Sequence, residues 1–240
     1  TFTYTHAHKH LRYQAQAHSD PIHITHAEFV QKAKAYRKTS KGSDGFLASE
    51  LAHMPSVASG DIVDALNAAC AEFVVPHQLL HNLNPLLGKP SGVRTICKTP
   101  MQYRIMAQCD HSVEQWESQY TASYDTCGKG RSALQAALFR ATLAEVSVAQ
   151  SRHVGGVFHD FSKSFDSIHT PTLIQQATAA QFPLPALCLA LSQHLSPRTI
   201  QFQDSCSPHI SIQQSIIAGW KFSVALTRAL LLGKIGRAHV

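Results

Sequence analysis

Apolar residues recur at a helical spacing along much of the chain. This pattern predicts helices over residues 27–37, 59–75, 131–150 and 172–180, a very apolar helix over 186–194 and a last helix over 222–232. Residues 78–83 and 100–118 are expected to be mostly helical as well. Residues 1–27 are polar and rich in histidine, so we expect a flexible lead-in there.

Strand-like patterns are shorter and fewer. Residues 93–97 alternate between apolar and polar positions after a Pro-Ser-Gly turn, and residues 197–202 and 209–212 read as two strands joined by a turn at 204–208. Val157 and Phe158 fit a short buried strand. We therefore expect an α+β fold, helix-rich with a small antiparallel sheet.

The composition suits a globular core and restricts the classes of function. Of the 240 residues, 44% are hydrophobic and 15% are charged, and 21 Lys and Arg against 15 Asp and Glu give a net charge of +6. That excess favours a polyanionic partner. No apolar run reaches the ~18 residues that a membrane-spanning helix needs, so we expect no membrane association.

Cysteine and histidine give no clear metal motif. The six cysteines form no C-x-x-C pair, and their spacing suggests neither a zinc site nor a disulfide framework, so we expect free thiols in an intracellular compartment, nuclear or cytoplasmic. Among the 16 histidines, His6, His8 and His10 alternate and on a strand would share one face. No Cys or acidic ligand lies near them, so scattered histidines are the simpler interpretation.

The stretch Val157–Ile168, VFHDFSKSFDSI, carries the strongest chemical signal. Asp160 lies where the apolar strand ends, and Thr170-Pro171 then starts a helix, with Pro at the first helical position. A carboxylate at a rigid strand end can hold a hard cation such as Mg²⁺. The alternative interpretation is a surface aspartate in front of a helix.

Three cations surround the turn and strand at residues 88–99. Lys89, Arg94 and Lys98 are spaced as a triphosphate or a nucleic-acid backbone requires, because both present several phosphates in a row. The alternative is a solvated basic edge strand that resists aggregation. A loop further on places Gly128 and Gly130 around Lys129, but it lacks the P-loop spacing and reads as an ordinary turn.

In their order along the chain, these segments resemble the fingers and palm of reverse transcriptases from retroelements without long terminal repeats. The resemblance covers residues 38–232. Residues 41–45 (KGSDG) resemble the start of the fingers, and residues 89–96 (KPSGVRTI) resemble the family's Lys-Pro-Gly-Gly-x-Arg-Pro-Ile stretch. Residues 160–166 resemble motif A, and residues 218–223 (AGWKFS) resemble motif B, which usually reads Gln-Gly-x-x-x-Ser.

The resemblance implies an RNA-directed DNA polymerase that uses an RNA template, a DNA primer and a dNTP. Asp160 would bind the catalytic Mg²⁺, with Mn²⁺ as a substitute, and Phe165 would exclude a ribose 2′-hydroxyl by bulk. The other positions carried over are assigned to nucleotide or template binding: Lys89, Arg94, Lys98, Gly219 and Ser223. Ala218 replaces the usual Gln, which puts the positioning of the template strand in question. Phe165 has a rival interpretation as a core aromatic.

The same likeness divides the chain into a fingers-like region, residues 28–152, and a partial palm, residues 153–232. Two-metal nucleotidyl transfer needs at least two well-placed carboxylates, and no Asp or Glu follows Asp204. Asp166 is set aside as the second ligand because it lies beyond the bulky Phe165. Residues 233–240 look like a translated sequencing adapter, so we expect a fragment cut before motif C and inactive as it stands.

Two other functions remain open. A non-catalytic nucleic-acid-binding relic of a retroelement would use a cationic face made of Lys89, Arg94, Lys98, Lys129 and Arg131. A metal-dependent phosphohydrolase would use Asp160 and Asp166, and loss of nuclease activity in either Asp→Asn variant would identify it.

Overall fold

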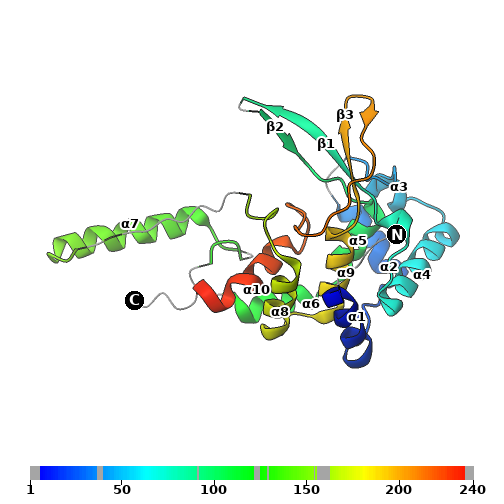
Figure 1. Cartoon of the computed structure of the whole chain (residues 1–240). Coiled ribbons are helices and arrows are strands. Elements are labelled where there is room, and N and C mark those ends of the chain that lie inside the picture. Colours follow the sequence, from blue (N-terminus) through cyan, green and yellow to red (C-terminus); the bar gives the residue numbers. More distant parts are fainter. Residues whose placement is uncertain are drawn as a thin grey trace.

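The computed structural model describes residues 6–36, 40–90, 92–121, 125–128, 130–153, 155 and 163–235 (Figure 1). Its helices are α1 (His6–His18), α2 (His26–Ala35), α3 (Ala48–Ala52), α4 (Ser56–Glu72), the 3₁₀ turn η1 (His77–Leu79), α5 (Met101–Cys109), α6 (Ser112–Tyr120), α7 (Ala133–Ala149), α8 (Thr170–Ala179), α9 (Leu184–His194) and α10 (Ser223–Ile235). Its strands are β1 (Asn82–Lys89), β2 (Gly92–Thr95), β3 (Arg198–Phe202) and β4 (Ser205–Cys206).

The fold is helix-rich with one small sheet, as expected for α+β, but the sheet is mixed rather than antiparallel. Its strand order is β2-β1-β3-β4, and β1 pairs antiparallel with β2 but parallel with β3. The parallel pair arises from α9. The side chain of Asn82, at the start of β1, donates to the backbone carbonyl of Gln193 (3.0 Å) and accepts from Nε2 of the Gln193 side chain (2.5 Å), and β3 begins shortly after α9 ends. Both strands therefore begin beside the end of α9, and β3 runs next to β1 in the same direction.

Helix α9 forms the centre of the core. Every residue from Ala186 to His194 is buried, and α1 and α8 pack against it. From α5, the hydroxyl of Tyr103 donates to the Leu189 carbonyl at 2.6 Å, and this bond satisfies a polar group inside an otherwise apolar contact. The sequence predicts such a helix because apolar residues fill all its faces, which is typical of full burial.

Residues 6–18 of the expected flexible lead-in instead form α1. Leu11 and Ala15, one helical turn apart, are buried together with His8. The ring of His8 is hydrogen-bonded through Nε2 to the Cys188 carbonyl at 3.2 Å, and burial lowers its pKa to about 4. The apolar face was hidden in the sequence because a neutral, buried histidine was counted as polar. His6, His8 and His10 thus lie on a helix and share no strand face.

Helix α7 forms where the periodicity predicts it, but it projects from the body of the protein (Figure 1). None of its 17 residues is buried; Leu134 is 79% exposed and Phe139 is 70% exposed. Ser132 caps its start by accepting from the Gln135 amide. Its helical structure therefore owes nothing to a buried face.

Other local predictions have mixed outcomes. Of the helical stretch expected at 78–83, only the turn His77–Leu79 forms, because the chain enters β1 at Asn82. Of the strand expected at 209–212, only an isolated bridge between Ile210 and Arg198 forms. Helix α10 runs on to Ile235 and so includes the first residues of the expected adapter tail. Among the described helices, none is both long and apolar enough to cross a bilayer.

Candidate functional site

A cavity of about 320 Å³ lies where four separate parts of the chain meet. The base of the β1–β2 hairpin contributes Arg94, the turn at residues 163–167 contributes Phe165, and the start of β3 contributes Arg198. The fourth wall is the segment Ile216–Ala218, and residues 219–222 separate it from the start of α10 at Ser223. Residues far apart in sequence therefore share one concave surface, which is the usual setting of a small-molecule site.

Backbone hydrogen bonds hold two of these walls together. The amide of Ile216 donates to the Phe165 carbonyl at 3.0 Å, and the amide of Ser215 donates to the Ile168 carbonyl at 3.1 Å. Ser215 adopts a left-handed backbone with φ of 117°, which is costly for a residue with a side chain. The bonds on both sides of the bend hold it in this conformation. The turn at residues 163–167 and the segment that leads into the motif-B residues consequently lie side by side.

Buried side chains support the same wall from behind. The amide of Ile217 donates to Nδ1 of His194 at 3.0 Å, and the hydroxyl of Ser223 donates to the Ile217 carbonyl at 2.5 Å. His194 is fully buried, and desolvation, aided by the nearby Arg198 guanidinium, lowers its pKa to about 3. The histidine is therefore neutral and acts as an acceptor that fixes the position of Ile217.

The cavity lining carries more positive than negative charge. Arg94, Lys163 and Arg198 face one carboxylate, Asp166. Arg198 donates to the Ser215 hydroxyl at 3.1 Å, and that hydroxyl approaches Oδ1 of Asp166 at 3.5 Å. Three cations around one pocket favour an anionic ligand, and guanidinium groups pair well with phosphate oxygens.

No reactive thiol is evident in this cavity. Cys97 lines it, but burial raises the pKa of its thiol to about 11, so the group stays protonated near neutral pH. All six cysteines, each within the described ranges, are free thiols, as the sequence predicts.

Two of the site residues expected from the sequence, Arg94 and Phe165, line the cavity. Lys89 is exposed at the end of β1, where it pairs with Gly92, and Lys98 is half-buried with its backbone bonded to Leu83 in both directions. Neither lysine is part of the cavity lining, so the three cations of the hairpin do not act on one point.

The motif-B residues are split between the cavity and the interior. Ala218 lines the cavity, and the adjacent Gly219 has a φ of +82° with no atom within 4 Å of where a side chain would begin. Glycine is therefore required there for its backbone conformation. Ser223 is buried at the start of α10 and its hydroxyl is used by the Ile217 carbonyl.

Asp160, the expected metal ligand, lies outside the described residues, as do Val157, Phe158 and Lys129. Within the ranges that are described, no three His, Cys, Asp or Glu side chains gather as a metal site. Asp166 nevertheless contributes one carboxylate to the cavity, although the sequence argument set it aside.

Sequence reasoning missed Lys163 and Arg198 as cavity residues. Lys163 lies within the segment that resembles motif A, and Arg198 lies within the strand expected at residues 197–202, so both residues belong to segments that the sequence analysis had identified. What the sequence lacks is the parallel pairing of β1 and β3, which brings Arg198 beside the hairpin.

No protein-family model matches the chain, and no curated protein matches it. The candidate function therefore rests on the geometry of the cavity and on the motifs that line it.

Proposed function

We propose that this chain is the fingers and partial palm of an RNA-directed DNA polymerase of the reverse-transcriptase kind, and that the cavity accepts the incoming nucleotide. One observation carries the proposal. Arg94, Phe165 and Ala218 come from three segments that each resemble a different reverse-transcriptase motif, and all three line one cavity. A chance likeness in short motifs gives no reason for such convergence.

In this proposal the cations bind the triphosphate. Arg94 and Arg198 each offer a planar fork of donors to phosphate oxygens, and Lys163 adds a point charge. Phe165 forms the wall beside the sugar, where bulk would exclude a 2′-hydroxyl. Ser223 acts as a positioning residue through its bond to the Ile217 carbonyl.

Magnesium fits this arrangement in part. Mg²⁺ is usually held by one or two carboxylates together with substrate phosphates, and Asp166 supplies one carboxylate to the cavity. Asp160 would supply another. The ion would neutralise charge on the phosphates and orient them, while Arg94, Lys163 and Arg198 bind the outer oxygens.

Nucleotide binding tests the proposal without requiring turnover. In a titration with dTTP and Mg²⁺, we expect Arg94→Gln to weaken binding by roughly 10- to 100-fold, since a hydrogen bond to a charged group contributes about 1.5–3 kcal/mol. Arg140→Gln, on the projecting α7, is the matched control and should bind as the parent does. If the parent does not bind dTTP, or if both variants bind it equally well, the proposal fails.

Discrimination between sugars tests the role of Phe165. The parent should prefer dTTP to the ribonucleotide, and Phe165→Val should reduce that preference while retaining dTTP binding. An unchanged preference in a folded variant would assign Phe165 to the core alone.

Exposed cations on the hairpin favour a second candidate, a nucleic-acid-binding relic. A relic would bind an RNA·DNA duplex in a salt-dependent manner. Lys89→Gln should then lower the slope of the logarithm of the binding constant against the logarithm of the salt concentration by about one unit. It would show no preference for a deoxynucleotide, so the two titrations separate the candidates. In a chain extended by an Asp-Asp hairpin, primer extension that Asp160→Asn abolishes would establish the polymerase.

A further inference from the structure

A second cavity, of about 380 Å³, shares Phe165 with the first as a lining residue. One face of α10 forms its floor through Val224, Thr227 and Leu231, which are spaced by one helical turn. The loop at residues 125–127 forms the opposite rim. The volume of this second cavity falls within the ~300–1,000 Å³ of typical small-molecule sites.

The walls of this second cavity are mainly apolar and include two aromatic rings. Phe165 closes one end, and Tyr120 lies at another, held by stacking on Trp116 at 5.1 Å and by a hydrogen bond from its hydroxyl to Gln181 at 2.8 Å. Because Tyr120 is fixed in this way, its ring offers a preformed flat wall. A flat, apolar ligand suits such a surface.

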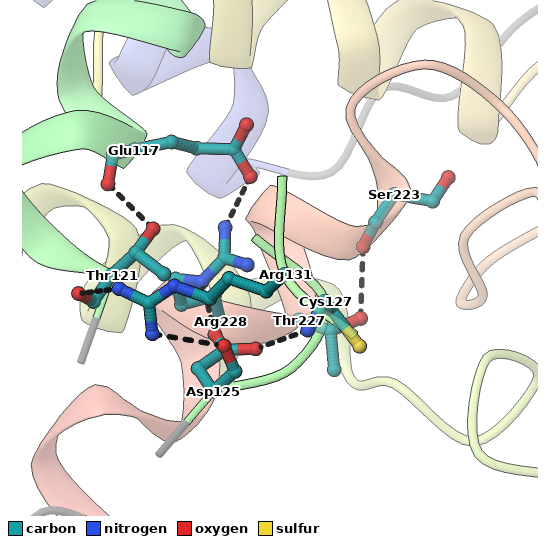
Figure 2. A network of polar contacts seen from close by, with 8 residues as sticks. All are labelled: Glu117, Thr121, Asp125, Cys127, Arg131, Ser223, Thr227 and Arg228. Carbon is teal, nitrogen blue, oxygen red and sulfur yellow. Dashed lines mark hydrogen bonds and ion pairs between the residues drawn. The ribbon is translucent and has the colours of Figure 1, made fainter. Parts of the chain in front are cut away.

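A charge-balanced network of polar contacts (Figure 2) reaches the second cavity through Asp125 and Arg228, which are part of its lining. Arg228 is buried and ion-paired with both Glu117 and Asp125, while Arg131 donates to the backbone carbonyls of Asp125 and Thr121. Burial alone would raise the pKa of Asp125, but hydrogen bonds from Arg228 and from the Cys127 amide hold it below its usual value. Two carboxylates thus face two guanidinium groups, and the network has no net charge to offer a ligand.

The network leaves acceptors for a ligand, together with one buried donor, Nη2 of Arg228, which has no hydrogen-bond partner among the described residues. The hydroxyl of Thr227 donates to the Ser223 carbonyl at 2.9 Å, so its lone pairs remain available (Figure 2). Each oxygen of Asp125 accepts from the protein but retains a second lone pair. A ligand that placed an N–H or O–H group here would therefore be matched.

We propose that this second cavity, between α10 and the loop at residues 125–127, binds a neutral aromatic molecule that carries an N–H or O–H group. The ring lies between Tyr120, Phe165 and Leu231, and the donor group faces Thr227 and Asp125. A charged ligand is disfavoured because the network is already balanced. Phe165 also lines the first cavity, so a ligand here contacts one wall of the site assigned to the nucleotide.

Cys127 allows the proposal to be tested on the intact chain. It is an exposed free thiol at the rim of the second cavity, and Cys206 on β4 is a second exposed free thiol that lines neither cavity. The protein is equilibrated with the disulfide of 4-(2-mercaptoethyl)phenol, or with hydroxyethyl disulfide, at graded reductant. Peptide mass mapping then gives the labelled fraction at each cysteine.

We expect the phenol to be retained at Cys127 at about tenfold higher reductant than at Cys206, whereas hydroxyethyl disulfide should label both equally. Leu231→Asp places a charge on the cavity wall and should remove the preference; Ile210→Asp, an exposed change near β3, should not. Far-UV circular dichroism confirms that both variants are folded. Equal retention of the phenol at the two thiols, or a preference that survives Leu231→Asp, overturns the proposal.

A coupled measurement, which rests on the proposed function, follows dTTP binding. Protein labelled at Cys127 with the phenol should bind dTTP at least threefold differently from protein labelled with hydroxyethyl disulfide, because Phe165 is shared. If the labelling is selective but the dTTP affinity is unchanged, only the coupling through Phe165 is refuted, and the proposed ligand site stands. Absence of dTTP binding in both forms would refute the nucleotide assignment and leave the labelling result intact.

Discussion

The buried histidine behind the first cavity should make the protein sensitive to acid. His194 is 0% exposed, and its pKa is lowered from 6.5 to about 3. An unfolded chain takes up a proton at this ring below about pH 6.5, whereas the folded chain resists until about pH 3. The unfolded state therefore binds more protons in this window, and stability is lost as the pH falls through it.

The magnitude follows from the shift in the pKa. One pKa unit corresponds to ~1.4 kcal/mol, so His194 contributes roughly 5 kcal/mol that is present at neutral pH and lost near pH 3. At about pH 5 the loss due to His194 reaches about 2 kcal/mol. The pKa of His8 is lowered to about 4, so its protonation should reduce the free energy of unfolding by a similar amount between neutral pH and about pH 5.

Urea unfolding at about pH 7.5 and about pH 5 measures this loss. His194→Asn cannot be protonated in this range, but its amide oxygen can still accept from the Ile217 amide. The free energy of unfolding should fall by about 4 kcal/mol between the two pH values in the parent and by about 2 kcal/mol in the variant. His153→Asn, at an exposed site, should behave as the parent. The same fall in the parent and in His194→Asn would refute the reasoning.

Three substitutions test other features of the fold. Gly219→Ala should destabilise the protein by about 1–2 kcal/mol, because φ is +82° there, whereas Gly60→Ala, in open space on α4, should stabilise it by up to ~1 kcal/mol. Urea unfolding gives both values, and equal effects at the two glycines would contradict the backbone argument. Phe139→Glu, on the exposed α7, should change the free energy of unfolding by less than ~0.5 kcal/mol and reduce aggregation seen by light scattering. A large loss of stability would mean that α7 is packed in solution.

The residues of the first cavity could be predicted from the sequence where a local sequence pattern or motif identified them. Arg94 was found because a turn and an alternating strand place a cation on a hairpin, and Phe165 because residues 160–166 resemble motif A. The contribution of Arg198 depends on the parallel pairing of β1 and β3, and that pairing depends on the contact between Asn82 and Gln193. Two polar residues in the core leave no trace in a hydrophobic pattern.

The fold shows the same division between local and long-range information. Helix α9 was found because its apolar residues cover all faces, which indicates a fully buried helix from the local sequence alone. Helix α1 was missed because its buried face includes His8, whose pKa is lowered by burial against α9. Such contacts between residues far apart in sequence can be identified only from the folded structure.

The isolation of α7 has a consequence for how the protein opens. Most helical stability in proteins comes from tertiary packing, and α7 buries none of its residues. The amides of α7 should therefore exchange with deuterated solvent through local opening, far ahead of those in α9. A protease should cut first between Ala133 and Ala149, leaving two fragments held together by the remaining core.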